Sequence, residues 1–212
     1  MKLTHFTYRM TRGVIGVLFR IATHQAYVGQ ENFPQPPYIL IANHISAFDI
    51  PLMGTICPHM VRGFAAAKHR RNPLFAPILL SAGVIWVRRG EVDRRALRKA
   101  LHILREEKGV LGIFPEGTRA RGPYALQRGK PGVAYLATRA DVPLVPLGIT
   151  GTETIKHNLS QLRRTRVRGV VGAPFRLPES GRVRGKKLTA YTDLIMQRIA
   201  EVLPEEYRGI YA

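Results

Sequence analysis

Short apolar runs along this chain alternate with segments in which apolar residues recur every three or four positions. The apolar runs predict buried strands at 38–42, 83–87, 110–114 and 144–150, with further strands at 64–67 and 167–173. Helical spacing predicts helices at 4–22, 50–60, 91–108, 132–140 and 188–203. Strands that alternate with helices are typical of an α/β domain with a largely parallel sheet flanked by helices.

The first predicted helix has an apolar stripe along one side. At about 100° per residue, six apolar side chains fall on an arc of roughly 120°. They are Phe6, Met10, Val14, Val17, Leu18 and Ile21. Arg9, Arg12 and Arg20 fall on the opposite side, and Ile15 and Phe19 depart from the pattern. Two interpretations stay open: a helix lying in a membrane interface, or an amphipathic helix packed on its own domain.

Polar residues with chemical potential follow the first buried strand directly. Asn43 and His44 come at its end, and Asp49 follows shortly after. Binding sites of α/β folds lie outside the carboxyl ends of strands. Histidine is suited to general base catalysis near neutral pH, and a carboxylate that accepts its Nδ1 proton fixes the tautomer. A surface histidine and an aspartate in the first turn of a helix would show the same spacing, so the pair alone does not decide.

Four motifs in order carry a resemblance to a known family. Asn43-His44-x-x-x-x-Asp49 resembles the first signature block of the glycerolipid (lysophospholipid) acyltransferase family, which includes bacterial 1-acyl-sn-glycerol-3-phosphate acyltransferases. Residues 83–89 resemble the second block, 114–119 match the third block fully, and 142–147 resemble the fourth. The resemblance covers residues 35 to 150 and implies the glycerol-3-phosphate acyltransferase-like α/β fold.

The resemblance implies an O-acyltransferase of phospholipid biosynthesis. It would move a fatty acyl group from acyl-CoA or acyl carrier protein to the free hydroxyl of 1-acyl-sn-glycerol-3-phosphate (lysophosphatidic acid), giving phosphatidic acid. His44 is then the catalytic base, and Asp49 holds it. No G-x-S-x-G motif is present, which agrees with direct transfer that has no acyl-enzyme intermediate.

The third block supplies the expected acceptor site. By resemblance, Arg119 is a ligand of the acceptor phosphate and Glu116 helps to organise the site. Gly117 and Thr118 lie between them, and the small Gly117 lets the backbone approach a ligand closely. A phosphate needs cations and N–H groups around it. Two further cations, Lys68 and Arg88, are predicted phosphate partners.

Departures from the family pattern leave the acceptor open. Ala120 stands where family members often have serine, and Trp86 and Arg89 make the second block a loose match. The same chemistry on glycerol-3-phosphate or another lysolipid is therefore an alternative. The prolines of 142–147 shape either a core strand or an apolar wall for the acyl chain.

Length and composition indicate one globular domain, which the resemblance identifies as an acyltransferase domain. The 212 residues can form one core, and we place an N-terminal helix and connection at 1–34 before a domain at 35–212. The single cysteine, Cys57, excludes an internal disulfide framework and fits a reducing compartment. The histidines show no metal-ligand spacing, so we expect neither a metal nor another cofactor.

The charge of the chain predicts a polyanionic partner. The net charge is +19, and residues 156–187 hold ten Lys or Arg against one acid, Glu179. No zinc-ligand or RRM-type pattern is present, so an anionic membrane surface is favoured over nucleic acid; an acidic carrier protein is another candidate. Without an apolar run of about 18 residues or a cleavage pattern, we expect a peripheral or monotopic protein on the cytoplasmic side of the cell membrane.

Two non-enzymatic functions are alternatives. A basic nucleic-acid-binding protein would bind tightly and salt-sensitively without needing His44. A lipid-binding protein that has lost catalysis is the other possibility. The presence of His44, Asp49, Glu116 and Arg119 together argues against that loss.

Overall fold

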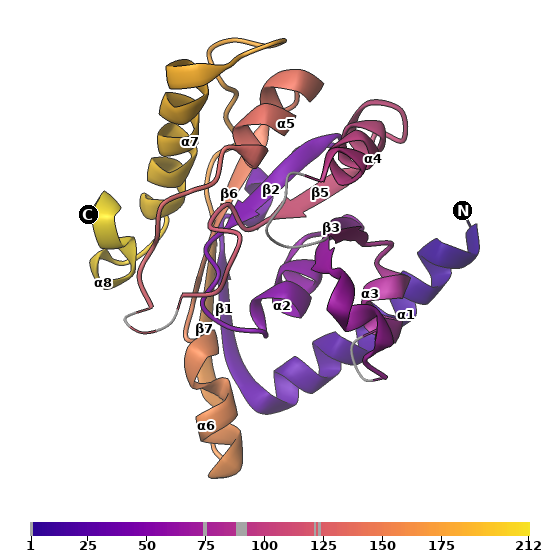
Figure 1. The fold of residues 1–212 in the computed structure, drawn as a ribbon. Helices are drawn as coiled ribbons and strands as arrows, with labels where there is room; N and C mark the ends of the chain where they lie inside the picture. The colour runs from indigo at the N-terminus through magenta and orange to yellow at the C-terminus, as the bar shows by residue number, and fades with distance from the viewer. Residues whose placement is uncertain (1, 74–75, 88–92, 121, 123) are drawn as a thin grey trace.

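The fold is one mixed sheet with helices on both faces (Figure 1). The computed structural model describes residues 2–73, 76–87, 93–120, 122 and 124–212. Within these ranges, seven strands pair in the order β1-β7-β6-β2-β5-β3-β4. The strands are β1 (Thr23–Val28), β2 (Tyr38–Ala42), β3 (Val61–Ala66), β4 (Ile85–Val87), β5 (Val110–Ile113), β6 (Leu144–Thr150) and β7 (Thr165–Val171). The predicted α/β class is thereby confirmed.

Strand direction sets where the site lies. Strands β6, β2, β5, β3 and β4 all run parallel to one another, so their carboxyl ends meet at one edge of the sheet. Strand β7 pairs antiparallel with β6, and β1 pairs parallel with β7. The predicted largely parallel sheet is confirmed, and one edge collects every loop that follows the five co-directional strands.

Helices cover the two faces of the sheet unequally. The helices are α1 (Lys2–Ala22), α2 (Asp49–Ile56), α3 (Ala76–Ser81), α4 (Arg94–Arg105), α5 (Gly132–Ala140), α6 (Ile155–Ser160), α7 (Gly185–Ala200) and α8 (Glu205–Arg208). Side chains of α4, α5 and α7 pack on one face, around Ile39 and Ile41 of β2. Helices α1 and α2 pack on the other face, around Leu40. Both faces of β2 are therefore buried, as its continuous apolar sequence predicts.

Strand β1 was not expected from the sequence, which predicted only a connection between the first helix and the strand at 38–42. That interpretation is wrong, because 23–28 pair along their length with β7. Strand β1 lies at the sheet edge, where Thr23 is buried while His24, Ala26 and Val28 are exposed. One face of this strand thus has no core to fill, so its sequence lacks the apolar run that marked β2.

Two predicted helices are shorter than expected, and three helices were missed. The helix expected at 50–60 ends at Ile56, because Cys57 is extended and Pro58 follows it. The helix expected at 91–108 spans Arg94–Arg105, and the Asp93 carboxylate caps it by accepting from two backbone N–H groups. Helices α3, α6 and α8 were not predicted; at six, six and four residues, they are too short to show a clear apolar period.

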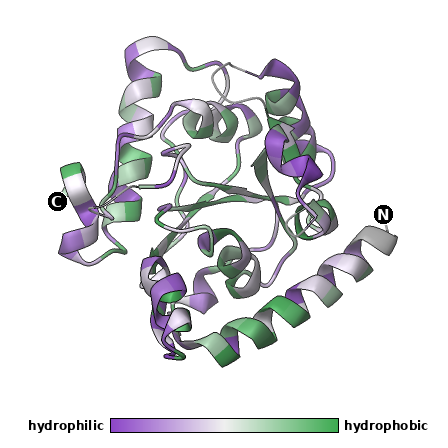
Figure 2. Ribbon diagram, turned by 60° about the horizontal axis from the view of Figure 1, so that its bottom comes forward, coloured by the Kyte–Doolittle hydropathy of each residue, from purple (hydrophilic) through white to green (hydrophobic). Residues whose placement is uncertain are grey.

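Helix α1 has two apolar faces with different surroundings. Tyr8 and Phe19 are buried against the domain, and Arg12 donates hydrogen bonds to the carbonyl oxygens of Thr55 and Pro58 around the end of α2. The predicted stripe faces solvent instead: Phe6, Met10, Val14, Val17, Leu18 and Ile21 are each more than half exposed. The stripe is not used in packing, and Figure 2 shows that the C-terminal half of α1 is strongly apolar.

Candidate active site

The candidate site lies at the edge where the parallel strands end. His44 follows β2, Glu116 follows β5, Lys68 follows β3 and Thr152 follows β6. Because β6, β2 and β5 are immediate neighbours, three of these segments converge on one point. This is the position that the open α/β architecture gives to binding sites.

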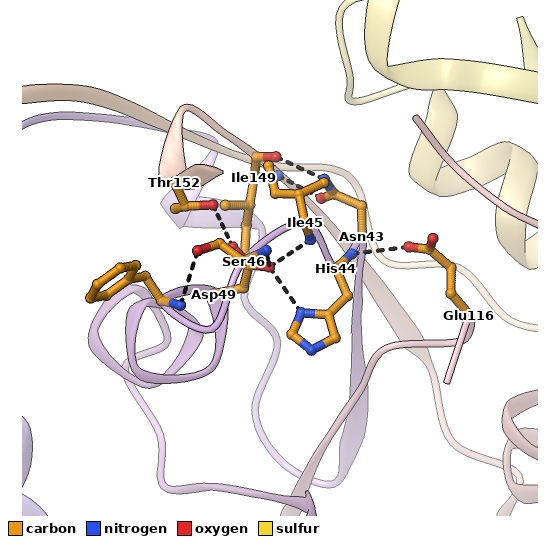
Figure 3. A network of polar contacts seen from close by, with 9 residues as sticks. Asn43, His44, Ile45, Ser46, Asp49, Glu116, Ile149 and Thr152 are labelled. Carbon is orange, nitrogen blue, oxygen red and sulfur yellow. Dashed lines mark hydrogen bonds and ion pairs between the residues drawn. The ribbon is translucent and has the colours of Figure 1, made fainter. Parts of the chain in front are cut away.

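His44 and Asp49 form the predicted pair. Nδ1 of His44 lies 2.9 Å from Oδ2 of Asp49, and Asp49 is fully buried. Because an ionised carboxylate only accepts hydrogen bonds, Nδ1 carries the proton and Nε2 is left as the basic nitrogen. Figure 3 shows Nε2 on the side of the ring away from Asp49. A base with this tautomer can take a proton from a hydroxyl placed against Nε2.

The Asp49 carboxylate is held by several donors at once (Figure 3). Oδ2 accepts the backbone N–H groups of Ile45 and Ser46, both at 2.7 Å, as well as the His44 proton. Oδ1 accepts the hydroxyl of Thr152 at 2.5 Å. These bonds compensate for burial of the charge and fix the carboxylate plane. The loop 43–49 is therefore wound around the side chain of Asp49.

Asn43 fastens this loop to the neighbouring strand. Its side-chain amide donates to the carbonyl oxygen of Ile149 and accepts the N–H of the same residue, both at 2.8 Å. The Asn43 side chain thus takes the place of a further β2 residue as the hydrogen-bond partner of β6. The two bonds set the position at which β2 ends and His44 begins.

Glu116 supports the other side of His44. Its carboxylate accepts the backbone N–H of His44 at 2.9 Å and that of Gln127 at 3.3 Å, and the residue is 3% exposed. Burial raises the pKa of the Glu116 carboxyl to about 7, although the two N–H donors oppose the shift; the charge of Asp49 adds to it. The predicted role of Glu116 in the acceptor site stays a prediction, and its visible contact is with the His44 backbone.

The third block also contacts the His44 ring and carbonyl group. The Phe114 ring stacks on the imidazole with 4.1 Å between ring centroids and 20° between planes. The N–H of Ala120 donates to the carbonyl oxygen of His44 at 2.8 Å. His44 is thus held through its backbone N–H, its carbonyl oxygen, its Nδ1 and one ring face, which leaves Nε2 as its reactive atom.

Two of the predicted phosphate ligands lie on segments that follow strands ending at this edge of the sheet, Arg119 after β5 and Lys68 after β3. Arg119 and Lys68 are exposed, and Lys68 lies on the short helix Ala67–Arg71 after β3. Neither has an ion-pair partner in the described part of the chain. Their role as phosphate ligands stays a prediction. Arg88, the other predicted partner, lies outside the described residues.

Lys130 is a further cation that the sequence did not single out. Gly117 has a φ of +69°, and a Cβ built on it would lie 3.0 Å from Nζ of Lys130. The lysine side chain therefore crosses the backbone of Gly117, and the Lys130 N–H donates to the carbonyl oxygen of Pro115. This contact joins the turn of the third block to the segment just before α5, so it depends on tertiary structure. Its only sequence signal was a positive charge close behind the third block.

Thr152 is the other residue that sequence reasoning missed. It comes from the segment after β6, is fully buried and reaches Asp49 across 103 positions of sequence.

Among the described residues, no group of three or more His, Cys, Asp or Glu side chains is placed to hold a metal ion. Nor do the described ranges contain a helix with the length and apolar character that crossing a membrane requires.

Comparisons with known proteins agree with this geometry. The family model described as Acyltransferase matches residues 24–150. A 1-acyl-sn-glycerol-3-phosphate acyltransferase of Saccharomyces cerevisiae is 31% identical over 131 residues, which cover 60% of this chain and 43% of that protein. A lyso-ornithine lipid O-acyltransferase of Pseudomonas aeruginosa is 32% identical over 120 residues, covering 57% and 45%. The chain thus spans less than half the length of these two relatives.

A solved structure shares the fold. It is the 1-acyl-sn-glycerophosphate acyltransferase PlsC from Thermotoga maritima, with a TM-score of 0.73 and 23% sequence identity. The match covers 95% of this chain and 80% of that one. The similarity therefore extends past the family-model region, to the N-terminal helix and the C-terminal elements.

Proposed function

Because the chain belongs to the acyltransferase family, we propose that it moves a fatty acyl group from a thioester to the free hydroxyl of 1-acyl-sn-glycerol-3-phosphate. The product is phosphatidic acid. The observation that carries this proposal is the buried His44–Asp49 pair with Nε2 of His44 left as a free base. The acyl donor is acyl-CoA or acyl carrier protein, both of which are thioesters.

The reaction needs one proton carrier and no covalent enzyme intermediate. Nε2 of His44 takes the proton of the acceptor hydroxyl while the oxygen attacks the thioester carbonyl carbon. The hydrogen bond from Nδ1 to Asp49 stabilises the imidazolium that forms. The carbon–sulfur bond then breaks, and the leaving thiolate takes the proton from Nε2. One ester and one thiol result for each thioester consumed.

Exposed cations beside the base support a phosphorylated acceptor. Lys130 crosses the backbone of Gly117, and Arg119 follows two positions later; both cations are exposed, whereas the carboxylate of Glu116 is turned inward to the His44 N–H. Cations of this kind bind a phosphate through charge-assisted hydrogen bonds.

A second candidate acceptor is a lyso-ornithine lipid, because the Pseudomonas aeruginosa relative bears that name at a similar identity. The base chemistry would be the same. The headgroup differs, since ornithine is an amino acid and carries no phosphate. The cations of the third block favour the phosphorylated acceptor.

Both candidate acceptors are amphiphiles, so we place the enzyme peripherally on an anionic membrane, on its cytoplasmic side. The exposed stripe of α1 and the absence of acidic residues from 2–22 support this location. Phe19 of α1 packs edge-on against Phe48, next to Asp49, with 6.2 Å between ring centroids. A helix lying in the interface would therefore hold the catalytic loop close to the lipid surface.

A competition assay tests the acceptor. Purified protein with acyl-CoA would receive equal amounts of 1-acylglycerol-3-phosphate and lyso-ornithine lipid, and both products would be measured by mass spectrometry. Phosphatidic acid as the main product supports the proposal. If acylated ornithine lipid is the main product, the proposed acceptor is wrong, and the proposed acyl-transfer chemistry still holds. If neither product forms, with acyl-CoA or with acyl carrier protein as the donor, both acceptors are rejected.

A further inference from the structure

The turn that ends α6 exposes a leucine in an unfavourable conformation. Leu162 is 96% exposed and has a φ of +55°. The N–H of Arg163 donates to the carbonyl oxygen of Asn158, which closes the helix end. Glycine or asparagine is usual at such a left-handed position, because a Cβ destabilises it. Neither backbone preference nor burial accounts for a leucine here, so its side chain points to a contact outside the chain.

The surroundings of Leu162 are strongly basic. Residues 155–168 contain no Asp or Glu, and their cations, Lys156, Arg163, Arg164, Arg166 and Arg168, are all exposed. Leu159 on the same turn is 43% exposed. An exposed leucine with Arg163 next to it, and with further exposed cations along the same segment, is complementary to a surface with anionic headgroups over an apolar interior. An acidic soluble protein would match the cations but offers no reason for the fully exposed leucine.

The α6 turn is fastened to the end of α1. Arg164 donates to the carbonyl oxygens of Arg20 and Thr23, both at 2.7 Å, where the helix ends. Figures 1 and 2 both show α6 beside this end of α1, and the exposed Leu18 and Ile21 belong to that end. The end of α1 that carries the last residues of the apolar stripe and the α6 turn therefore lie close together.

We propose that the α6 turn is a second membrane-contact point, at which Leu162 inserts among the lipids of an anionic membrane while Arg163 and its basic neighbours bind the headgroups. The inference rests on the membrane location proposed above and deepens it. A single amphipathic helix can roll about its own axis. A second contact fixed to α1 through Arg164 removes that freedom and sets the orientation of the catalytic loop toward the lipid.

A site-specific probe tests insertion directly. Cys57 is fully buried, so a cysteine introduced at an exposed position is the thiol that labels. Leu162→Cys and a control, Ile210→Cys, would carry an environment-sensitive dye; Ile210 is 63% exposed near the C-terminus. With vesicles of phosphatidylcholine and phosphatidylglycerol, the dye at 162 brightens and shifts to the blue, and the dye at 210 does not. An unresponsive dye at 162 on vesicle-bound protein overturns the inference and leaves the α1 contact standing.

A substitution separates membrane contact from folding. Leu162→Asn relieves the left-handed strain, so its Tm rises or stays the same, while affinity for the anionic vesicles falls about tenfold. Ile210→Asn keeps the affinity of the wild type. Equal vesicle binding by Leu162→Asn and wild type contradicts the inference.

Activity on a short-chain, fully dissolved acceptor distinguishes the two proposals. The Leu162→Asn variant keeps wild-type turnover there, because Leu162 is not part of the catalytic loop. If the wild type inserts position 162 into vesicles but transfers no acyl group, the proposed reaction fails and the membrane contact stands. If it transfers acyl groups but does not bind vesicles, the membrane contact fails and the reaction stands.

Discussion

The hydroxyl of Thr152 donates a 2.5 Å hydrogen bond to Oδ1 of Asp49, the oxygen that the loop 43–49 leaves without a backbone donor. Both residues are fully buried. Thr152 therefore acts on the catalytic base indirectly: it fixes the Asp49 carboxylate, which in turn orients His44. It is a positioning residue contributed by the segment after β6, while the base comes from the loop after β2 and its carboxylate from the start of α2.

Thr152→Val is expected to lower kcat about tenfold or more while leaving the KM for the acceptor nearly unchanged. The valine keeps the shape but removes the donor, which costs about 1–3 kcal/mol for a buried acceptor. Thr152→Ser restores the hydroxyl and most of the turnover. Steady-state kinetics of the three proteins check this. Equal loss in the valine and serine variants would indicate a packing role for the threonine methyl group instead.

Arg119→Ala and Lys130→Met are each expected to raise the KM for 1-acylglycerol-3-phosphate about tenfold, because each removes a charge-assisted contact to the phosphate. Turnover at saturation changes less. The matched control is Lys99→Met, an exposed lysine on α4, away from the sheet edge. With 1-acylglycerol, which lacks the phosphate, the variants and the wild type are expected to behave alike. An unchanged KM for the phosphorylated acceptor would move the phosphate site elsewhere.

The raised pKa of Glu116 predicts that the stability of the protein falls as the pH rises. The pKa of its carboxyl is 4.5 in a model compound and about 7 in the folded chain, chiefly because of burial. The folded state therefore binds this proton more tightly, and the free energy of unfolding falls as the pH rises between these two values. The total effect of this one group is on the order of 3 kcal/mol.

Glu116→Gln removes that titration and is expected to flatten the fall in stability over the same pH interval. Chemical denaturation at a series of pH values measures it. Glu106→Gln, an exposed residue at the end of α4, is the control and keeps the slope of the wild type. A slope unaltered by Glu116→Gln would mean that the carboxylate is better solvated than its 3% exposure indicates.

Local sequence was sufficient for the central pair and insufficient for its supports. His44 and Asp49 are close in sequence, so a single tight loop brings them together, and the apolar run of β2 marks where that loop begins. Thr152 and Lys130 reach the site through tertiary structure, and an isolated threonine or lysine carries no periodic signal. The contact of Glu116 with the His44 N–H likewise depends on the pairing of β2 with β5.

The same contrast holds for the fold. Strands β2, β5 and β6 are buried on both faces and were predicted from continuous apolar runs. Strand β1 was missed because it is an edge strand with one exposed face. For α1, packing on its own domain is confirmed, although through Tyr8 and Phe19 and not through the predicted stripe; the stripe stays exposed, and its contact with a membrane stays a prediction. The spacing of apolar residues alone does not show which of them pack on the domain and which stay exposed.

The measurement that tests the central claim most directly is acyl transfer by the wild type and by His44→Ala. Free thiol and phosphatidic acid would be followed together after mixing with acyl-CoA and 1-acylglycerol-3-phosphate, with circular dichroism and Tm as folding controls. The wild type is expected to form both products in equal amounts. The folded variant is expected to lose about 10³-fold or more of that rate, because the general base is gone. Turnover of the folded variant close to that of the wild type would contradict catalysis by His44.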